Sequence, residues 1–430
     1  MFQSVRRGLG VCGAAVWAVA VLLWAPGLSG SVSGLSASAS TKTGPPHGGT
    51  ARPELQRRLD EVVAAGAPGV VALVNEGRGG WRGDRAVWQD ARGVADLQTR
   101  RPMRPDVRFR VGSLTKSFVA TVALQLVAER RLALTDTVGR WLPGALPYGD
   151  QVTVRQLLNH TSGVPDFVAQ VVPGLYAGDR FRSWRPRELV ALVAGQPPEF
   201  PAGSQWSYSN ANYVLVGMII ERVTGRELGS ELERRIFRPL QLRDTYFPVD
   251  FPFLLSYARG YALDLDEEGS PIEGPLLDFT VYNPSLAWAA GNIVSDMDDL
   301  ARFYRALLGG RLLEPAQLAE MKTRVELVPG IGYGLGMFVF DTDCGSMWGH
   351  TGGIQGFLNE FFSSEDGTRQ YGVMLNVDPP PEAVFEPNLR ATDQALAEAF
   401  GRPCPYPPAP SSTSVPMTAM GAMQHGVADR

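Results

Sequence analysis

The sequence predicts an α+β fold: an antiparallel sheet built from both ends of the chain and flanked by helices, with an inserted lobe that is mostly helical. Segments with the composition of strands occur near both ends, whereas helical patterns and long loops rich in proline and glycine fill the middle. The 430 residues exceed the length of one typical domain, which favours one large two-lobed body or two domains. A cleft between two such lobes is a natural place for a functional site.

The N-terminal part of this fold is predicted to contain one helix and three short strands. Leu55, Leu59 and Val62 recur at helical spacing and predict a helix over 53–65. β-Branched and apolar runs predict strands over 69–74, 88–94 and 107–111.

Helices dominate the middle of the chain. A strong apolar pattern predicts a helix over 117–129, and shorter helical patterns follow at 154–158, 186–194, 212–224 and 228–236. Ser295 has the residue type of a helix N-cap, and three aspartates follow it at the positive end of a helix predicted to end at Leu308.

Strand patterns return late in the chain, which then closes with one more helix. The predicted strands cover 334–340, 346–349, 356–363 and 370–377, and an amphipathic helix covers 388–400. The folded domain is thus predicted to span 53–404, with the helical lobe at about 117–290. The tail over 405–430 is rich in proline, serine, alanine and methionine, so we expect it to be disordered.

The composition is that of a globular protein without a basic surface. The 40 basic and 44 acidic residues give a formal charge of −4. A nucleic-acid-binding protein normally has a basic excess or a basic stripe, so we expect no nucleic-acid partner. With 44% hydrophobic and 20% charged residues, the chain is too apolar to be disordered as a whole.

The first 39 residues have the three parts of a secretory signal peptide. A segment with Arg6, Arg7 and no acidic residue is followed by the apolar stretch 11–28 and then by a run of small residues. That order predicts cleavage after Ala39 and export from the cytoplasm. We therefore expect a secreted, extracytoplasmic protein whose mature chain begins with a linker over 40–52.

An uncleaved membrane anchor is the alternative interpretation of the same segment, because the apolar stretch approaches the length that spans a bilayer. Pro26 and the glycine and serine residues after it favour cleavage. The arginine pair is compatible with either the general or the twin-arginine export route.

The cysteines fit an oxidising compartment. Of the three, Cys12 would leave with the signal peptide. Cys344 and Cys404 remain as an even pair, which predicts a disulfide between a late strand and the chain beyond the last helix. Two free thiols are the alternative, and they are less common outside the cytoplasm.

Ser113 and Lys116 lie where a strand turns into a helix, and their spacing of three residues places both side chains on one helix face. A serine hydroxyl becomes a good nucleophile when a base takes its proton, and a lysine with a lowered pKa can be that base. Lys116 is one of only three lysines among 40 basic residues, and arginine does not lose its proton in proteins. The alternative is a helix-capping serine followed by a surface lysine.

Tyr208 and Asn210 lie two residues apart on a loop that opens into a predicted helix, so both can point into one cleft. A phenol can relay a proton, and an amide can bind a peptide-like substrate. A loop tyrosine and a turn asparagine without a catalytic role are the alternative for this pair taken alone.

The segment 350–353, His-Thr-Gly-Gly, forms a third group on a predicted strand edge, where glycine lets a substrate backbone come close. His350 could lie beside Tyr208, whereas we expect His160 to be a structural hydrogen-bonding residue at a helix end. These two histidines lack metal-ligand spacing, so we expect neither a metal nor another cofactor.

In chain order, Ser-x-x-Lys, Tyr-x-Asn and His-Thr-Gly resemble the motifs of the penicillin-recognising serine hydrolases, in the branch of class C β-lactamases and DD-peptidases. Within that branch the chain is most similar to the secreted D-alanyl-D-alanine carboxypeptidases of actinomycetes, from about residue 55 to residue 404. The resemblance implies a β-lactamase/transpeptidase-like fold. It also places Cys344 and Cys404 where those carboxypeptidases have their disulfide.

The resemblance implies catalytic roles for five residues. Ser113 would be the nucleophile that becomes acylated, and Lys116 the amine that activates it. Tyr208 would pass the proton to the leaving group, and Asn210 and His350 would assist it.

The resemblance also implies a substrate-binding set. The backbone N–H groups of Ser113 and Gly353 would form the oxyanion hole. Asn210, Thr351 and Gly353 would contact the substrate.

Two departures from the carboxypeptidase pattern concern the leaving-group side. Those enzymes have an arginine where this chain has Phe338 or Val339, and a threonine where it has Gly353. In the family these two side chains hold the free carboxylate of the substrate. Their loss removes a charge-assisted contact of roughly 1.5–3 kcal/mol, so we expect an apolar and open leaving-group side.

The leading hypothesis is a secreted serine acyl hydrolase, a D-alanyl-D-alanine carboxypeptidase that acts on peptidoglycan stem peptides as a monomer, with β-lactams as covalent inhibitors or substrates. An esterase, a β-lactamase or a D-amino-acid amidase on the same fold is the first alternative, because it tolerates the missing carboxylate-binding groups. A cell-wall-binding pseudoenzyme is the second, and the complete set of motif residues argues against it. An α/β-hydrolase is disfavoured because the sequence has no Gly-x-Ser-x-Gly motif.

Overall fold

The computed structural model describes residues 51–77, 87–248, 257–266 and 269–405. The predicted signal peptide, the predicted linker up to residue 50 and the predicted tail from residue 406 onward lie outside the described residues. Within the described ranges, no helix is both long and apolar enough to cross a membrane.

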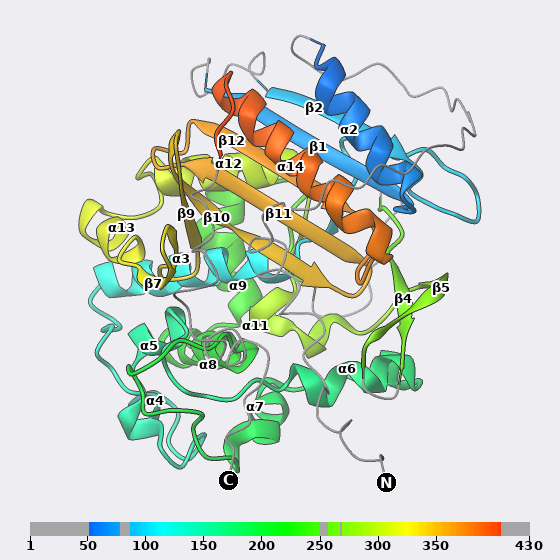
Figure 1. Ribbon diagram of the computed structural model, residues 1–430. Coiled ribbons are helices and arrows are strands. Elements are labelled where there is room, and N and C mark those ends of the chain that lie inside the picture. The colour runs from blue at the N-terminus through cyan, green and yellow to red at the C-terminus, as the bar shows by residue number, and fades with distance from the viewer. Residues whose placement is uncertain (1–50, 78–86, 249–256, 267–268, 406–430) are drawn as a thin grey trace, which may run out of the picture.

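An antiparallel sheet of eight strands forms the centre of the described structure, in the order β2-β1-β12-β11-β10-β9-β8-β7. β1, from the N-terminal part, pairs with β12, from the C-terminal part, so that Val70 lies opposite Leu375. The predicted sheet built from both ends of the chain is therefore confirmed (Figure 1). Its strands are β1 (Gly69–Glu76), β2 (Val87–Gly93), β7 (Val325–Val328), β8 (Ile331–Tyr333), β9 (Phe338–Thr342), β10 (Gly345–Ile354), β11 (Phe357–Ser364) and β12 (Arg369–Leu375).

Two helices from opposite ends of the chain cover one face of this sheet side by side (Figure 1). They are α2 (Pro53–Ala64) and α14 (Phe385–Phe400). Leu59 of α2 and Leu396 of α14 are buried in the same apolar cluster, which explains the helical periodicity of both segments. Arg52, just before α2, forms ion pairs with Glu76 of β1 and Glu398 of α14, so it ties the two ends of the chain together.

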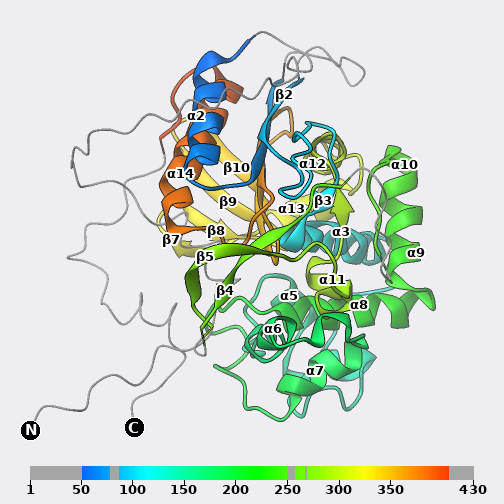
Figure 2. The same cartoon turned by 90° about the vertical axis from the view of Figure 1, so that its right-hand side faces the viewer.

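The opposite face of the sheet packs against α3 and α12, and the helical lobe lies beyond them (Figure 2). Tyr304 of α12 stacks on Phe361 of β11, with ring centroids 5.3 Å apart. Because α3 lies between the sheet and the lobe, most of its residues are buried. The helices on this side are α3 (Thr115–Ala128), α4 (Val138–Trp141), α5 (Val154–Leu158), α6 (Val168–Tyr176), α7 (Pro186–Ala194), α8 (Asn210–Thr224), α9 (Leu228–Leu232), α10 (Arg238–Leu240), α11 (Trp288–Gly291), α12 (Met297–Leu308) and α13 (Pro315–Met321).

Several strands carry no clear sequence signal. Two small sheets pair β3 (Phe109–Arg110) with β6 (Val294–Ser295) and β4 (Tyr261–Leu265) with β5 (Pro271–Asp278). β3 lies within the strand predicted over 107–111, whereas β4, β5 and β6 have no predicted counterpart. β5 is largely exposed and contains prolines and glycine, which are unusual in strands, and β7 and β8 are very short.

One predicted strand starts late. The strand predicted over 334–340 begins only at Phe338, because Gly334 N–H donates to Met337 O at 2.8 Å and Gly336 has a φ of 87°, which makes this segment a turn.

The helix predicted to follow Ser295 begins one residue later than expected. Asp296 is its N-cap, and the carboxylate accepts a hydrogen bond from Asp299 N at 2.8 Å. Ser295 instead pairs with Phe109 in the small sheet, and its hydroxyl lies 2.7 Å from that of Thr245. The prediction of Ser295 as the N-cap is therefore wrong, because strand pairing keeps that residue outside the helix.

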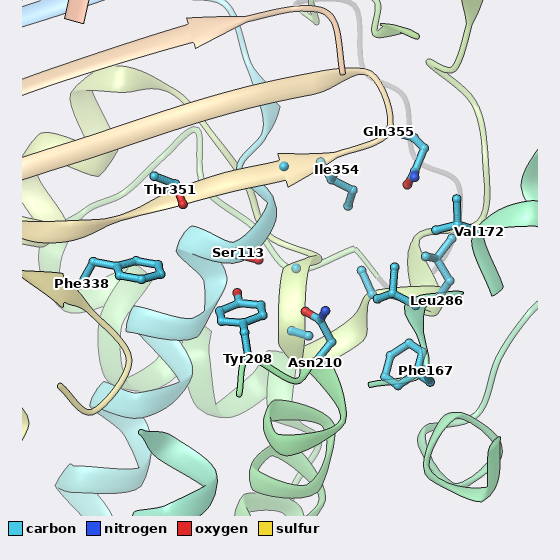
Figure 3. A pocket seen from close by; sticks show the side chains of 15 residues that line it. Ser113, Phe167, Val172, Tyr208, Asn210, Leu286, Phe338, Thr351, Ile354 and Gln355 are labelled. Atoms are coloured by element: carbon cyan, nitrogen blue, oxygen red, sulfur yellow. The ribbon is translucent and has the colours of Figure 1, made fainter. Parts of the chain in front are cut away.

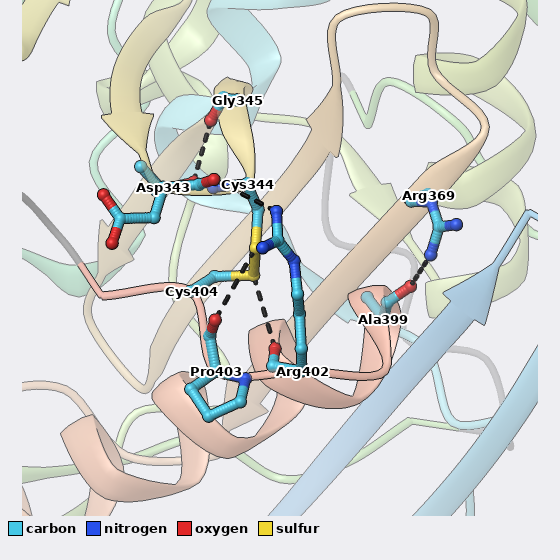
Figure 4. The surroundings of a disulfide bond; sticks show 9 residues. Asp343, Cys344, Gly345, Arg369, Ala399, Arg402, Pro403 and Cys404 are labelled. Carbon is cyan, nitrogen blue, oxygen red and sulfur yellow. Dashed lines mark hydrogen bonds between the residues drawn. A yellow bond between two sulfur atoms is a disulfide. The ribbon is translucent and has the colours of Figure 1, made fainter.

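Cys344 and Cys404 form a disulfide, as predicted (Figure 4). Cys344 lies in the turn between β9 and β10, and Cys404 lies just beyond α14. Beside the bridge, Arg402 donates a hydrogen bond to Asp343 O at 3.1 Å. The bridge thus attaches the end of the folded chain to the hairpin that carries segment 350–353.

Replacing both cysteines by serine should lower the free energy of unfolding by about 4 kcal/mol, because the bridge closes a loop across a sequence separation of 60 residues in the unfolded chain. Chemical denaturation of both proteins without reductant measures the difference. Reductant should shift the wild-type transition toward that of the variant and leave the variant unchanged. Equal stability without reductant would contradict the prediction.

Candidate active site

Ser113 lies in the turn between β3 and α3. Residues Gly112–Leu114 form a 3-10 turn directly before α3, and Ser113 lines a cavity between the sheet and the helical lobe. The turn approaches β10 so closely that a Cβ on Gly352 would lie 2.1 Å from Val111 O. Gly112 has a φ of 55°, which also favours glycine. These two glycines allow Ser113 to lie against the edge of the sheet.

The Lys116 amine is buried and has three polar contacts. Nζ lies 2.9 Å from Ser113 Oγ, 2.8 Å from Asn210 Oδ1 and 2.8 Å from the backbone oxygen of Ala290. Burial lowers the pKa of Lys116 to about 7, while the charge of Asp166 acts in the opposite direction. A neutral amine donates two hydrogens and accepts with one lone pair. Because the Asn210 and Ala290 oxygens only accept, the lone pair is left for the Ser113 hydroxyl.

Asp166, which lies outside the three motifs, fixes the orientation of Asn210. Its carboxylate accepts hydrogen bonds from Asn210 N at 3.1 Å and from Asn210 Nδ2 at 2.9 Å. Because the amide nitrogen is bound to the carboxylate, the amide oxygen faces Lys116. The sequence offers only a weak signal for Asp166, namely its place directly after Pro165 in a loop with Gly163.

Tyr208 lies with its hydroxyl toward Ser113 (Figure 3). Burial raises the pKa of Tyr208 well above its ordinary value, and a hydrogen bond with Ser113 offsets only part of that shift, so the phenol stays protonated. The His160 ring packs on the Tyr208 ring, with centroids 4.2 Å apart, and its Nδ1 accepts a hydrogen bond from Ser209 N at 3.2 Å. His160 thus forms a hydrogen bond just beyond the end of α5, as predicted.

His350 lies behind the cavity. Thr351 and Gly353 are among the described lining residues and His350 is not. The His350 ring is buried, 6.3 Å from the Tyr208 ring between centroids. Its Nδ1 contacts Thr351 O, which can only accept, and its Nε2 lies 3.0 Å from the Tyr333 hydroxyl. Nδ1 therefore carries the hydrogen and Nε2 accepts one from Tyr333.

Burial also lowers the pKa of His350 to about 3, so the ring is neutral at neutral pH. Both ring nitrogens are occupied in this arrangement. Direct assistance of His350 to Tyr208 stays a prediction, and it would require one of these hydrogen bonds to break.

The edge of β10 next to Ser113 is suited to an oxyanion hole. Among the described strands, β9 pairs with β10 only over Gly345–Gly349, which leaves the following residues of β10 unpaired on that side. Asn359 donates hydrogen bonds to Arg110 O at 2.9 Å and to Gly352 O at 3.2 Å, which joins β11, β10 and the strand before Ser113. Ser113 and Gly353 line one cavity, one from a helix start and one from a strand edge.

The cavity is mostly apolar, with a volume of about 60 Å³. In Figure 3 Phe338 lies at one end and Leu286 at the other, with Ser113 between them. Of the two candidates for the position of the family's arginine, Phe338 is the one that lines the cavity. The described lining contains no arginine or lysine. Its apolar side chains include Phe167, Val168, Val172, Leu286, Phe338 and Ile354.

Comparison of the chain with known proteins identifies the family to which it belongs. The Beta-lactamase family model matches residues 55–395. Penicillin-binding protein 4* of Bacillus subtilis (strain 168) is 29% identical over 335 residues, which cover 74% of this chain and 71% of that relative. Esterase EstB of Burkholderia gladioli is 31% identical over 304 residues, which cover 64% of this chain and 76% of that relative.

Among solved structures, a D-stereospecific amidohydrolase from Streptomyces sp. superposes with a TM-score of 0.71 and 37% identity, over 82% of this chain and 99% of that chain. The chain belongs to the β-lactamase family, and it is a serine hydrolase of that family. The predicted β-lactamase/transpeptidase-like fold is confirmed.

The rate of acylation should depend on the protonation of Lys116. Because only the neutral amine accepts the Ser113 proton, kcat/KM should rise with pH around a midpoint of about 7. Below the midpoint the rate should fall about tenfold for each pH unit. Initial rates with a chromogenic ester from about pH 5 to about pH 9 measure the profile. A flat profile across this range would exclude Lys116 as the base.

Replacing Asp166 by asparagine should lower kcat by about tenfold, because the Asn210 amide would no longer be held in one orientation. The midpoint of the pH profile should also move lower, since the Asp166 charge raises the pKa of Lys116. Asp166→Glu, which keeps the charge, is the matched control and should keep the wild-type midpoint. A lower kcat without a shifted midpoint in Asp166→Asn would indicate a packing role only.

Proposed function

We propose that this hydrolase cleaves amides or esters of D-amino acids that release an uncharged amine or alcohol, through an acyl-enzyme on Ser113. The observation that carries the proposal is the contact of Ser113 Oγ with the buried Lys116 amine in a cavity whose described lining has no cation. A free carboxylate on the leaving group is normally bound by a guanidinium or an ammonium. The lining therefore favours substrates without that carboxylate.

Acylation begins when Ser113 Oγ bonds to the substrate carbonyl carbon and its proton passes to neutral Lys116. The charge that develops on the carbonyl oxygen is stabilised by the N–H groups of Ser113 and Gly353, worth roughly 3–4 kcal/mol each. The bond to the leaving nitrogen or oxygen then breaks. Protonated Tyr208 supplies the proton that the leaving group needs and recovers one from Lys116.

Deacylation repeats these steps with water as the nucleophile. Water bonds to the acyl carbon and gives up a proton to Lys116, and Ser113 Oγ leaves and takes a proton back. The products are a carboxylic acid and, from the first step, an amine or an alcohol. In this scheme His350 is a positioning residue, because its ring fixes Thr351 and Tyr333.

Two likenesses support the substrate class. The similar Streptomyces protein is a D-stereospecific amidohydrolase, and the similar Burkholderia protein is an esterase. Hydrolysis of a simple amide or ester releases an amine or an alcohol that carries no carboxylate. Phe338 and Gly353 give the cavity an apolar side without a hydroxyl at the positions where the carboxypeptidase pattern has arginine and threonine.

D-Alanyl-D-alanine carboxypeptidase is the second candidate function. It is favoured by the motif resemblance and by the likeness to penicillin-binding protein 4*. Its substrate would be a peptidoglycan stem peptide, and a monomer secreted by the predicted signal peptide would meet that substrate outside the cytoplasm. Thr351 and Gln355, which line the cavity, would then have to hold the free carboxylate without a cation.

The charge of the leaving group separates the two candidates. An N-acylated D-Ala-D-Ala peptide and its C-terminal amide should be hydrolysed with kcat/KM values within about threefold of each other, because no cation in the described lining faces the carboxylate. A preference of about tenfold or more for the acid, which equals about 1.4 kcal/mol, would instead support the carboxypeptidase. The same peptides with L-Ala on the acyl side are the control for stereospecificity.

Benzylpenicillin tests the site independently of the substrate. Mass spectrometry should detect a covalent adduct on Ser113 in the wild-type protein and none in Ser113→Ala. An unmodified Ser113 after prolonged incubation, together with no hydrolysis of any peptide or ester, would support the pseudoenzyme.

A further inference from the structure

A second cavity in the helical lobe is lined by α4 and the residues directly after it, by α7 and by α8. In Figure 1 these helices lie on the side of the sheet away from α2 and α14. The volume of the cavity is about 370 Å³, and small-molecule sites commonly have volumes of about 300–1,000 Å³. Apolar side chains such as Trp141, Val190 and Met218 line it together with Arg187 and Arg222. We propose that this cavity binds a small carboxylate with an apolar body.

The two arginines of this cavity have no polar partner in the part of the chain that the structure describes. Neither Arg187 nor Arg222 forms a hydrogen bond or an ion pair with any described residue. Other arginines in the described ranges are commonly paired, as Arg235 is with Glu129 and Glu231. Both arginines line this one cavity, so an anion bound in it would be attracted by two guanidinium groups.

The position of Arg187 is unfavourable in the structure as it stands. Arg187 is the second residue of α7, so it lies at the positive end of the helix dipole, where a cation is disfavoured. Glu188, which follows it, is engaged by Arg185 and does not neutralise it. A bound anion would be favoured both by Arg187 and by this end of α7.

The apolar lining continues from each arginine along its own helix. Val190 and Ala194 lie three and seven residues after Arg187, so all three share one face of α7. Met218 lies four residues before Arg222 on α8. A ligand with one anionic group at the guanidinium groups and a hydrocarbon body along these faces matches the cavity. A carboxylate accepts hydrogen bonds from guanidinium in a bidentate geometry, which makes it the anion of choice.

This cavity shares no described lining residue with the Ser113 cavity. Asn210 is the first residue of α8, and Arg222 lies twelve residues later, which corresponds to about 18 Å along the helix. The occupant is therefore a ligand other than the substrate, and the inference does not rest on the proposed function.

Calorimetric titration of the purified protein with octanoate tests the inference, with octan-1-ol as the uncharged probe of equal length. Octanoate should bind, and octan-1-ol should bind at least about tenfold more weakly, because it cannot engage the guanidinium groups. The double variant Arg187→Gln/Arg222→Gln should weaken octanoate binding at least about tenfold. Both side chains are exposed and have no polar partner in the described ranges, so this variant should unfold at or above the wild-type temperature.

Arg243→Gln is the matched control, because Arg243 is also exposed and without a polar partner in the described part of the chain but lies outside the cavity lining. It should leave octanoate binding unchanged. The inference is overturned if octanoate does not bind, if octan-1-ol binds equally well, or if the double variant binds octanoate as the wild type does. If octanoate bound at the Ser113 cavity instead, the double variant would bind it as the wild type does.

Discussion

The burial of one amine between the sheet and the helical lobe is the constraint on which the rest of the structure depends. Lys116 has 0% exposure, and its polar partners come from the turn before α3, from the start of α8 and from α11. A charged ammonium at such a position carries a large desolvation cost, and the group avoids it by a lowered pKa. A displacement of one lobe against the other would break at least one of these hydrogen bonds, so the packing of the lobes and the chemistry of Ser113 are coupled.

Close backbone contacts hold α3 against the sheet in the same region. A Cβ on Gly336 would lie 2.6 Å from that of Ala120, and Ser117 donates a hydrogen bond to Gly336 O at 2.7 Å. The turn before β9 is thus fixed to α3, as Gly352 of β10 is fixed to the turn that carries Ser113. Because β10 is also paired with β11 in the middle of the sheet, the position of Gly353 is set by the whole sheet rather than by a loop.

The part of the site that is local in sequence could be predicted, and the part that is made by the tertiary fold could not. Ser113 and Lys116 share one helix start, and their contact follows from a spacing of three residues. The carboxylate of Asp166 and the carbonyl of Ala290 reach their partners across sequence separations of 44 and 174 residues. A local pattern marks Asp166 only weakly and Ala290 not at all. The surroundings of His350 could not be predicted for the same reason. The Tyr333 hydroxyl, which hydrogen-bonds to Nε2 of the His350 ring, lies in a three-residue strand that is too short to show a strand pattern. In the fold, apolar runs predict the long buried strands of the large sheet, whereas the largely exposed strand β5 has no such run.

The division of acid and base roles in the proposed mechanism follows from the depth of the site. Burial disfavours whichever form of a group is charged, so it lowers the pKa of Lys116 and raises the pKa of Tyr208. Near neutral pH the amine is therefore ready to accept a proton while the phenol is ready to donate one. The reverse assignment, with a tyrosinate as the base, would need a cation beside the ring; the Lys116 ammonium, 4.8 Å from the ring centroid, could supply it only by giving up its own capacity to accept a proton. Burial alone thus sets the protonation state of both groups before any substrate binds. In the proposed mechanism, the choice of substrate then depends on the residues that line the cavity, among them Phe338 and Gly353.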